Sequence, residues 1–385
     1  MTHSVFINAI SSFLPLDPVP NEAMEPRLGQ VGDKPSRARK LILRSNGIKQ
    51  RHYVIDAQGV ARYTNAELTA EAISGLQNDE FSLEQIDCLV ASTSLPDQIM
   101  PNHAVMVHGE LGIPPCEVVS TAGICLCGVT ALKYAYLSVA SGESCTAVAT
   151  GSEVASNLMQ ASTFDQEYEL RLAELEHNPE IAFEKDFLRW MLSDGAGAVL
   201  LQNHPRARGL SLKVDWIDTL SFANEMPACM YAGAEKDAEG GLVSWTRINA
   251  KERSLKSTMS VKQDVKLLNE HIVRLTVVEM LKRIKNKRSL QAESIDYFLP
   301  HYSSEFFRER LAEGMQASGL DIPQEKWFTN LVDKGNTGSA SIFIILEALF
   351  HSGRLEDGQK ILCYVPESGR FSSAFMQLTV VNNAL

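Results

Sequence analysis

The sequence has 385 residues, of which 45% are hydrophobic and 22% charged, and its formal net charge at pH 7 is −11. This is an ordinary globular composition, which excludes disorder, collagen and a coiled coil as the main architecture. The negative charge argues against a nucleic-acid-binding protein, and the apolar stretches are too short to predict a membrane span. The apolar N-terminus has no basic residue ahead of it and no cleavage site, so no secretory signal is expected.

The chain contains seven cysteines, at Cys88, Cys116, Cys125, Cys127, Cys145, Cys229 and Cys363. An odd number without any CxxC pair predicts neither a disulfide framework nor a zinc site. We therefore expect a reduced, cytoplasmic protein in which most cysteines pack in the core as small residues. At least one of them is expected to take part in chemistry.

Short apolar runs bounded by turn residues predict buried strands. They cover residues 86–92, 145–150, 196–201, 295–299, 361–365 and 375–381. Helical patterns lie between these runs, and this alternation predicts an α/β protein.

Two parts of the chain resemble each other. An Ile-Asp pair precedes an apolar strand at Asp87 and again at Asp296, 209 residues later. Long helices without proline end in Ser-Gly at 141–142 and at 352–353, 211 residues apart, and each precedes a strand. We interpret the pattern as a duplicated half rich in βαβ units. Chance similarity between generic α/β segments is the alternative.

The duplication divides the chain into two halves, residues 1–205 and 206–385. Three reactive side chains occupy related positions in these halves. Cys125 and Asn336, which are 211 residues apart, each precede a long helix, and His301 follows a strand. Ligands of α/β sheets bind outside the carboxyl ends of strands, where helix N-termini also point. Packing of the halves is therefore expected to bring the three side chains to one crevice.

Cys125 lies in a turn of small residues that opens a helix. A helix N-terminus lowers the pKa of a cysteine there and directs a backbone N–H at an oxyanion, so Cys125 is a candidate nucleophile. Cys127, about 200° farther round the helix, is expected to pack instead. A core cysteine, a hydrogen-bonded structural histidine and a helix-capping asparagine are the alternatives for Cys125, His301 and Asn336.

Motifs of one enzyme family run almost from end to end of the chain. They are Asn46-Gly47-Ile48, 92–96, the Cys125 turn followed by Ala131-Leu132, 151–153, 194–198, Pro300-His301, 335–337 and 368–371. With them the chain resembles the β-ketoacyl-acyl carrier protein synthase III-like condensing enzymes of the thiolase superfamily. The resemblance implies an acyltransferase that forms carbon–carbon bonds, with the duplicated five-layered αβαβα thiolase fold.

The resemblance also implies roles for individual residues. Cys125 would be acylated, while His301 and Asn336 would hold the thioester carbonyl of the second substrate. Gly369 would supply a second oxyanion-hole N–H beside that of Cys125. The substrates would be thioesters of coenzyme A or acyl carrier protein, with no cofactor and no metal. Two copies would form a homodimer through the strand at 145–150.

Departures from the common pattern indicate a narrower group. No aromatic residue lies near Asn46, where the ordinary starter enzyme has a tryptophan that stacks on coenzyme A, and residues 164–191 form a longer stretch than usual. Segments 32–49, 187–197 and 365–371 are similar to the ketosynthase/cyclases of dialkylresorcinol, flexirubin and stilbene pathways. The expected reaction joins an acyl group on Cys125 to a β-ketoacyl thioester and closes a six-membered ring. The alternative is an ordinary synthase III that condenses with malonyl thioester and releases carbon dioxide.

Glu153 follows the strand at 145–150 and is a candidate base. A carboxylate there would take a proton from the second substrate when no decarboxylation supplies the carbanion. A glutamate that stabilises a helix start is the alternative. A non-catalytic subunit, and a transacylase or thioester hydrolase, are rival functions on the same fold.

A block of basic residues without any acidic one covers residues 34–51. Its members are Lys34, Arg37, Arg39, Lys40, Arg44, Lys49 and Arg51. We interpret the block as a docking patch for the phosphopantetheine phosphate and an acidic carrier protein. A solvated basic helix face is the alternative. Because the stacking aromatic is missing, a carrier protein is favoured over free coenzyme A.

Overall fold

The computed structural model describes residues 3–31, 39–164 and 187–383. The strands of its main sheet are β1 (Phe6–Phe13), β4 (Cys88–Thr93), β5 (Glu117–Ala122), β6 (Thr146–Glu153), β7 (Gly195–Gln202), β8 (Gly209–Ser221), β13 (Tyr297–Pro300), β14 (Lys360–Glu367) and β15 (Ser372–Asn383). The helices are α1 (Met24–Leu28), α2 (Arg39–Asn46), α3 (Asn65–Ser74), α4 (His103–Leu111), α5 (Cys127–Ser141), α8 (Ala250–Leu255), α9 (Val265–Val273), α10 (Met280–Lys287), α11 (Arg308–Ala317), α12 (Leu331–Lys334) and α13 (Ser341–Phe350). Short strands pair as β2 (Val19–Pro20) with β3 (Gln50–Arg51), β9 (Met230–Tyr231) with β12 (Lys262–Gln263) and β10 (Ala234–Lys236) with β11 (Leu242–Ser244).

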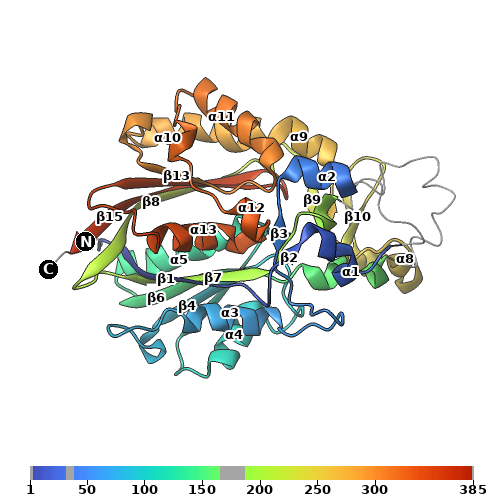
Figure 1. The fold of residues 1–385 in the computed structure, drawn as a ribbon, viewed down its shortest axis with the longest axis horizontal. Coiled ribbons are helices and arrows are strands. Elements are labelled where there is room, and N and C mark those ends of the chain that lie inside the picture. Colours follow the sequence, from blue (N-terminus) through green and yellow to red (C-terminus); the bar gives the residue numbers. More distant parts are fainter. Residues whose placement is uncertain (1–2, 32–38, 165–186, 384–385) are drawn as a thin grey trace.

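The elements stack in five layers (Figure 1). The strand order is β13-β14-β15-β8-β1-β7-β6-β4-β5, and β1 and β8 pair only at Phe6 and Ile7. The ladder therefore separates into two sheets, with α5 and α13 between them, α3 and α4 below, and α10 and α11 above. This arrangement confirms the predicted five-layered αβαβα thiolase fold.

All six predicted strands are present, as β4, β6, β7, β13, β14 and β15. The sequence analysis missed β1, β5 and β8. β5 is an edge strand whose residues are all partly or fully exposed, so it lacks the apolar run that marked the others. In β1 and β8 polar residues interrupt the apolar pattern.

The same hydrogen-bonding arrangement occurs once in each half. The Asp87 N–H donates to the Thr146 carbonyl (3.0 Å), and the Asp87 carboxylate accepts the Thr146 N–H (3.0 Å). The Asp296 N–H donates to the Lys360 carbonyl (2.9 Å), and the Asp296 carboxylate accepts the Lys360 N–H (2.8 Å). These are the two Ile-Asp positions of the sequence repeat, so the similarity extends to the bonds that start β6 and β14.

The strand proposed to join two subunits lies inside the sheet. β6 is bonded to β7 on one side and to β4 on the other, so its backbone groups are already paired within the chain. Pairing between subunits along 145–150 is therefore wrong. Among the described strands, β5 has an edge without a strand partner, since it is bonded only to β4.

The backbone at the opening of α13 packs directly against the backbone of α5 and of β6. A Cβ on Gly128, in α5, would lie 2.4 Å from the Ser339 carbonyl oxygen, and a Cβ on Gly151, in β6, would lie 2.3 Å from the same atom. Real Cβ atoms do not come so close, so both positions require glycine. Ser339 belongs to the 3₁₀ turn at Gly338–Ala340 that opens α13, and the contact fixes that opening against the start of α5.

Candidate active site

Cys125 lies in the turn between β5 and α5 and lines a cavity with a volume of about 320 Å³. Glu367, the last residue of β14, is hydrogen-bonded to the backbone of this turn. Its Oε2 accepts the backbone N–H of Ile124 (2.9 Å) and that of Leu126 (3.3 Å). Cys127 is buried in α5 and is absent from the cavity wall, as the helix phase predicted.

The Cys125 thiol is not activated in the way that the sequence suggested. Burial, followed by the charges of Glu367 and Glu153, raises the pKa of Cys125 well above its usual value. The predicted lowering by the helix N-terminus is therefore wrong. Two of the amides at that terminus are already occupied by a carboxylate, and its negative charge opposes formation of a thiolate.

His301 follows β13 and is 3% exposed. Its backbone N–H donates to the Tyr364 carbonyl on β14 (2.8 Å), which anchors the residue while its ring lines the cavity. Burial lowers the pKa of His301 to about 4. The imidazole is therefore neutral at pH 7 and offers one ring N–H donor to a ligand.

Asn336 reaches the cavity from the loop between α12 and α13. Its backbone bonds to the 191–193 segment, because its N–H donates to the Met191 carbonyl (3.1 Å) and its carbonyl accepts the Ser193 N–H (2.9 Å). The side-chain Oδ1 accepts the Gly338 N–H (3.0 Å), which leaves the amide NH₂ as the group free to donate. Gly335 precedes it at φ +71, packed against Ser193.

Glu153 is the last residue of β6, so the alternative of a helix-starting glutamate is wrong. Its carboxylate lines the cavity and is held by donors on two sides. Oε2 accepts the Ser94 hydroxyl (2.5 Å), and Oε1 accepts the N–H groups of Ser94 and Ser339 (both 3.2 Å). Burial raises the pKa of Glu153, while these hydrogen bonds oppose the shift.

Gly369 lies beside the nucleophile turn, since a Cβ on it would be 3.1 Å from the Ile124 side chain. Its carbonyl accepts the N–H of Cys229 (2.8 Å), which fixes the orientation of the peptide. The Gly369 N–H has no hydrogen-bond partner among the described residues. Gly369 is not among the residues that line the cavity, so its N–H as part of an oxyanion hole stays a prediction.

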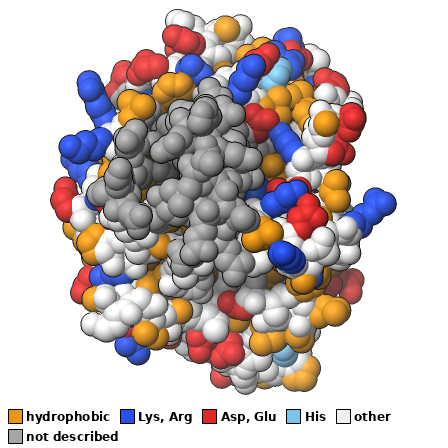
Figure 2. All heavy atoms as spheres, turned by 90° about the vertical axis from the view of Figure 1, so that its right-hand side faces the viewer, with side chains coloured by type: hydrophobic (Ala, Val, Ile, Leu, Met, Phe, Trp, Pro, Cys, Tyr) orange, Lys and Arg blue, Asp and Glu red, His pale blue; other side chains and the backbone are white. Residues whose placement is uncertain are grey.

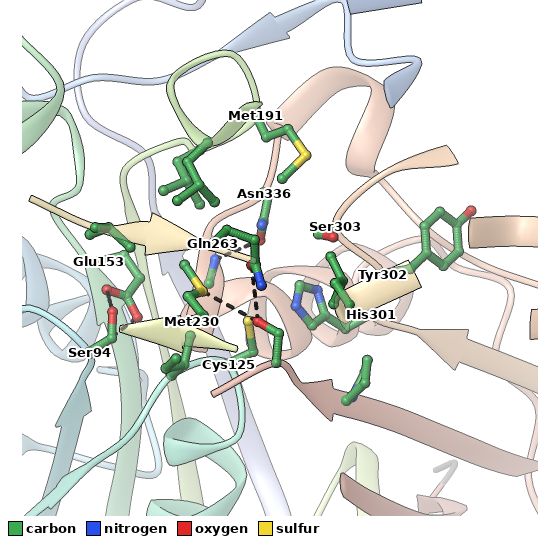
Figure 3. A pocket seen from close by; sticks show the side chains of 18 of the residues that line it. Ser94, Cys125, Glu153, Met191, Met230, Gln263, His301, Tyr302, Ser303 and Asn336 are labelled. Atoms are coloured by element: carbon green, nitrogen blue, oxygen red, sulfur yellow. Dashed lines mark hydrogen bonds between the residues drawn. The ribbon is translucent and has the colours of Figure 1, made fainter. Parts of the chain in front are cut away.

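The cavity brings together side chains that are far apart in the sequence (Figure 3). Cys125, His301, Asn336 and Glu153 all line it, and the figure shows Cys125, His301 and Asn336 turned toward the same space. Most of the remaining wall is apolar. Its members include Leu188, Met191, Leu192, Leu268, Ile272, Val273, Phe307 and Leu311. Such a wall suits an alkyl chain that ends at the polar residues.

The sequence analysis missed several polar residues of the site. Ser94 and Gln263 line the cavity, and Gln263 accepts a hydrogen bond from the Ser368 hydroxyl (3.4 Å). Ser94 stands in the motif at 92–96, which therefore marked it, whereas Gln263 stands in no motif and had no sequence signal. Glu367 did have a signal, because it begins the C-terminal loop segment that departs from the family's glycine-rich pattern.

The basic block divides into buried, paired and exposed residues. Arg51 is fully buried and donates to the Trp190 carbonyl (2.6 Å), so its part in a docking surface is wrong. Arg39 forms an ion pair with Glu25 (2.7 Å). Lys40, Arg44 and Lys49 are exposed, whereas Lys34 and Arg37 lie outside the described residues. On the face at the right of Figure 1, the visible basic and acidic side chains are interspersed (Figure 2).

Within residues 3–31, 39–164 and 187–383, no group of three or more His, Cys, Asp and Glu side chains is arranged to hold a metal ion. None of the helices in these ranges combines the length and the apolar character that crossing a membrane requires.

Comparison with known proteins relates the chain to one group of enzymes. Residues 286–371 match the family model described as 3-oxoacyl-(acyl-carrier-protein) synthase III C terminal. A β-ketoacyl-(acyl-carrier-protein) synthase III of Xanthomonas oryzae is 26% identical over 83% of this chain and 84% of its own. The protein of the same name from Ruegeria pomeroyi is 24% identical over 94% of this chain and 95% of its own.

Solved structures share the fold over nearly the whole length. AbyA1, a tetronic acid condensing enzyme, superimposes with a TM-score of 0.75 at 20% identity, over 97% of this chain and 99% of its own. Xanthomonas campestris OleA, solved with bound lauric acid and lauroyl-CoA, gives 0.71 at 19% identity, over 98% and 100%. Pseudomonas aeruginosa FabH gives 0.70 at 19% identity, over 98% of each chain. Fold and sequence relationship together identify a condensing-type acyltransferase that has the thiolase fold and is similar to synthase III.

Proposed function

We propose that this protein joins an acyl group carried on Cys125 to the α-carbon of a second thioester. In the first step the Cys125 sulfur attacks the thioester carbonyl of the acyl donor. The bond from that carbonyl to the carrier sulfur breaks, and the released thiol takes up the proton that Cys125 loses. In the second step the α-carbanion of the other substrate attacks the acyl carbon, and Cys125 leaves as thiolate.

The observation that carries this proposal is the convergence of Cys125, His301 and Asn336 on one cavity. The neutral imidazole and the free Asn336 amide are two donors for the oxygen of an enolate, and they place no positive charge beside the thiol. The N–H groups of Cys125 and Gly369 serve the tetrahedral oxyanion of the acyl group. Substrate thioesters supply the reactive groups, so the chemistry needs no cofactor.

For the finer reaction we propose that a β-ketoacyl thioester and the acyl group on Cys125 close a six-membered ring by forming two carbon–carbon bonds. When the acyl group is α,β-unsaturated, the carbon between the two carbonyls of the β-ketoacyl thioester adds to the acyl β-carbon. The carbon on the other side of the ketone then attacks the acyl carbonyl, and Cys125 leaves as thiolate. The carbon between the two carbonyls of such a substrate is acidic, so a carboxylate suffices to remove its proton. Glu153 lines the cavity and has its pKa raised by burial, which suits this role. Glu153 would take the proton while His301 and Asn336 hold the enolate.

A second candidate is the ordinary decarboxylative condensation with a malonyl thioester. It is favoured by the three donors that surround the Glu153 carboxylate, because a group held in this way already has a structural role at the start of α13. The curated relatives are also named synthase III. In this reaction loss of carbon dioxide supplies the carbanion, and no base is required at Glu153.

Incubation with paired substrates separates the two candidates. The purified protein is given either an α,β-unsaturated acyl thioester with a β-ketoacyl thioester or a saturated acyl thioester with a malonyl thioester, and the products are analysed by mass spectrometry. A cyclic product without carbon dioxide from the first pair supports the ring-forming reaction. A linear β-ketoacyl product with carbon dioxide from the second pair alone supports the decarboxylative one. Free acid or an exchanged thioester, without any new carbon–carbon bond, contradicts both.

For substrate delivery we propose that an acyl carrier protein docks at the exposed basic residues Lys40, Arg44 and Lys49. All three lie on or just after α2, so they present positive charge from one short segment. Replacement of the three by Glu is expected to raise KM for acyl carrier protein thioesters and leave KM for short pantetheine thioesters unchanged. Equal effects on both substrates would contradict the docking role.

We also propose a homodimer, with the pairing moved to β5. The β5 edge is open among the described strands, and α5 beside it exposes Tyr134 (39%) and Leu137 (53%). The Tyr134 hydroxyl donates to Glu117 on β5 (2.6 Å), so strand and helix form one surface. Light scattering at micromolar concentration is expected to give a dimer, and Leu137→Glu is expected to shift it toward monomer. A monomeric wild type would overturn this proposal.

A further inference from the structure

Glu367 is a half-buried carboxylate to which the reaction described above gives no role. Both of its hydrogen bonds go to backbone amides, those of Ile124 and Leu126, which are the two neighbours of Cys125. Its Oε2 would also lie 3.2 Å from a Cβ on Gly123. Glu367 does not line the cavity, although its neighbours Pro366 and Ser368 do.

The second half of the molecule contains a matching contact. Glu153 ends β6 as Glu367 ends β14, and the two are 214 positions apart, as are the first residues of the strands, Thr146 and Lys360. Glu153 accepts the backbone N–H of Ser339, at the opening of α13. Each carboxylate therefore crosses to the opposite half and holds the amides at the start of its central helix.

The contact determines which amide near the nucleophile stays available. With the N–H groups of residues 124 and 126 directed at Glu367, the N–H of Cys125 lies between two fixed peptides and contacts the Cys125 sulfur itself. Gly369, two residues after Glu367, provides the other free N–H beside the turn. The short segment 367–369 thus affects both N–H groups of the proposed oxyanion hole. Glu367 holds the turn that carries the Cys125 N–H, and Gly369 provides the second N–H.

We propose that Glu367 is a positioning residue that fixes the nucleophile turn through the two amides flanking Cys125 and so directs the Cys125 N–H into the cavity. The proposal rests on the proposed role of Cys125 as nucleophile. A carboxylate serves here because one oxygen accepts both amides, and hydrogen bonds to a charged acceptor are about twice as strong as neutral ones.

The same charge keeps the thiol protonated between turnovers. The titratable groups that face Cys125 are Glu367 from β14, Glu153 from β6 and neutral His301 after β13. Neither carboxylate favours a thiolate, and both contribute to the raised pKa of Cys125.

Two variants separate the hydrogen bonds of Glu367 from its charge. Glu367→Gln keeps an oxygen acceptor for both amides and removes the charge, whereas Glu367→Ala removes both. Acylation of Cys125 by an acyl-CoA is followed by intact-protein mass spectrometry, and thiol reactivity by iodoacetamide alkylation from pH 6 to 10. Glu356→Gln makes the same charge change at an exposed position before β14 and is the matched control.

The acylation rate of Glu367→Ala is expected to fall about 10- to 100-fold with KM unchanged, because a displaced nucleophile loses near-attack geometry. Glu367→Gln is expected to acylate within about threefold of the wild type. Its alkylation is expected to become about three- to tenfold faster below the thiol pKa, since removal of a like charge favours the thiolate. The control is expected to match the wild type in both assays.

Equal acylation rates in the wild type and Glu367→Ala would overturn the proposal, and so would a Glu367→Gln variant as slow as a folded Glu367→Ala. If Glu367→Ala does not fold, the two assays on Glu367→Gln decide, and an unchanged alkylation profile with slowed acylation counts against the proposal. If no thioester acylates even the wild type, the proposed function fails instead. Alkylation does not depend on a thioester and still tests Glu367.

Discussion

The openings of α5 and α13 are the two related regions of this molecule that meet at the site. One presents Cys125 and the other Asn336, and each is held by a carboxylate from the opposite half. They differ in access, because Glu153 lines the cavity whereas Glu367 does not. The same contact between a carboxylate and a helix opening therefore occurs in both halves. Only the carboxylate of Glu153 lies where a substrate in the cavity can reach it.

The two openings also differ in the group they offer. At α5 the amides are shared between a carboxylate and the nucleophile, so the thiol is kept neutral by burial and by charge. At α13 the Asn336 Oδ1 is engaged by Gly338, and the amide NH₂ remains as a donor. In the proposed reaction, the opening of α5 therefore carries the acyl group on Cys125, and the opening of α13 stabilises the oxygen of the second substrate. The experiments below test that division.

Replacement of the nucleophile is expected to have the largest effect. Cys125→Ala should give no acyl adduct with any thioester, because the reacting sulfur is lost. Cys127→Ala should keep most of the activity, since Cys127 is buried away from the cavity. Intact-protein mass spectrometry after incubation with an acyl-CoA measures both. An adduct on Cys125→Ala, together with none on Cys127→Ala, would reverse the assignment.

Removal of the donor at the second opening is expected to affect only the second step. Asn336→Ala should leave acylation of Cys125 intact and slow condensation about 100- to 1000-fold, the usual loss for one donor to a developing oxyanion. Rapid-quench measurement of acylation and of product formation separates the two steps. A variant that loses acylation as strongly as condensation would show that Asn336 does not act on the second substrate alone.

Neutralisation of Glu153 tests whether its access to the cavity matters for chemistry. Glu153→Gln keeps an acceptor for the Ser339 N–H and removes the base. Under the ring-forming reaction, condensation with a β-ketoacyl thioester should slow about 100-fold or more while acylation persists. Under the decarboxylative reaction, turnover of malonyl thioester should stay close to that of the wild type.

The smallest effect is expected for a change of pH around the usual histidine pKa. Because burial lowers the pKa of His301 to about 4, the ring stays neutral as the pH falls from 8 to 5. Condensation by a pre-acylated enzyme should therefore show no break near pH 6.5, and should decline only as the pH approaches that lowered value. Single-turnover rates across this range measure it. A break near 6.5 that disappears in His301→Ala would contradict the neutral donor.

The amino-acid pattern predicted most of the fold and the membership of the site. Strands with continuous apolar runs were found, and the repeat brought Cys125 and Asn336 to related positions. The pKa values of the site residues and the pairing of the strands could not be predicted in this way. The pKa of Cys125 depends on Glu367, which is 242 residues away in the chain, and whether β6 has a free edge depends on the strands that pack beside it. Burial of Arg51 likewise follows from tertiary contacts that a run of basic residues does not reveal.

The contact of Gly128 and Gly151 with the Ser339 carbonyl has a consequence for how such an enzyme changes over time. The spacing between the two helix openings is set by backbone atoms that leave no room for a side chain, so it cannot be adjusted by small substitutions. The apolar wall is different, because residues such as Leu268, Ile272 and Leu311 line the cavity with side chains alone. Mutation can therefore alter the length and shape of the accepted acyl chain while the reacting groups keep their distances, and substrate range can diverge without loss of the reaction.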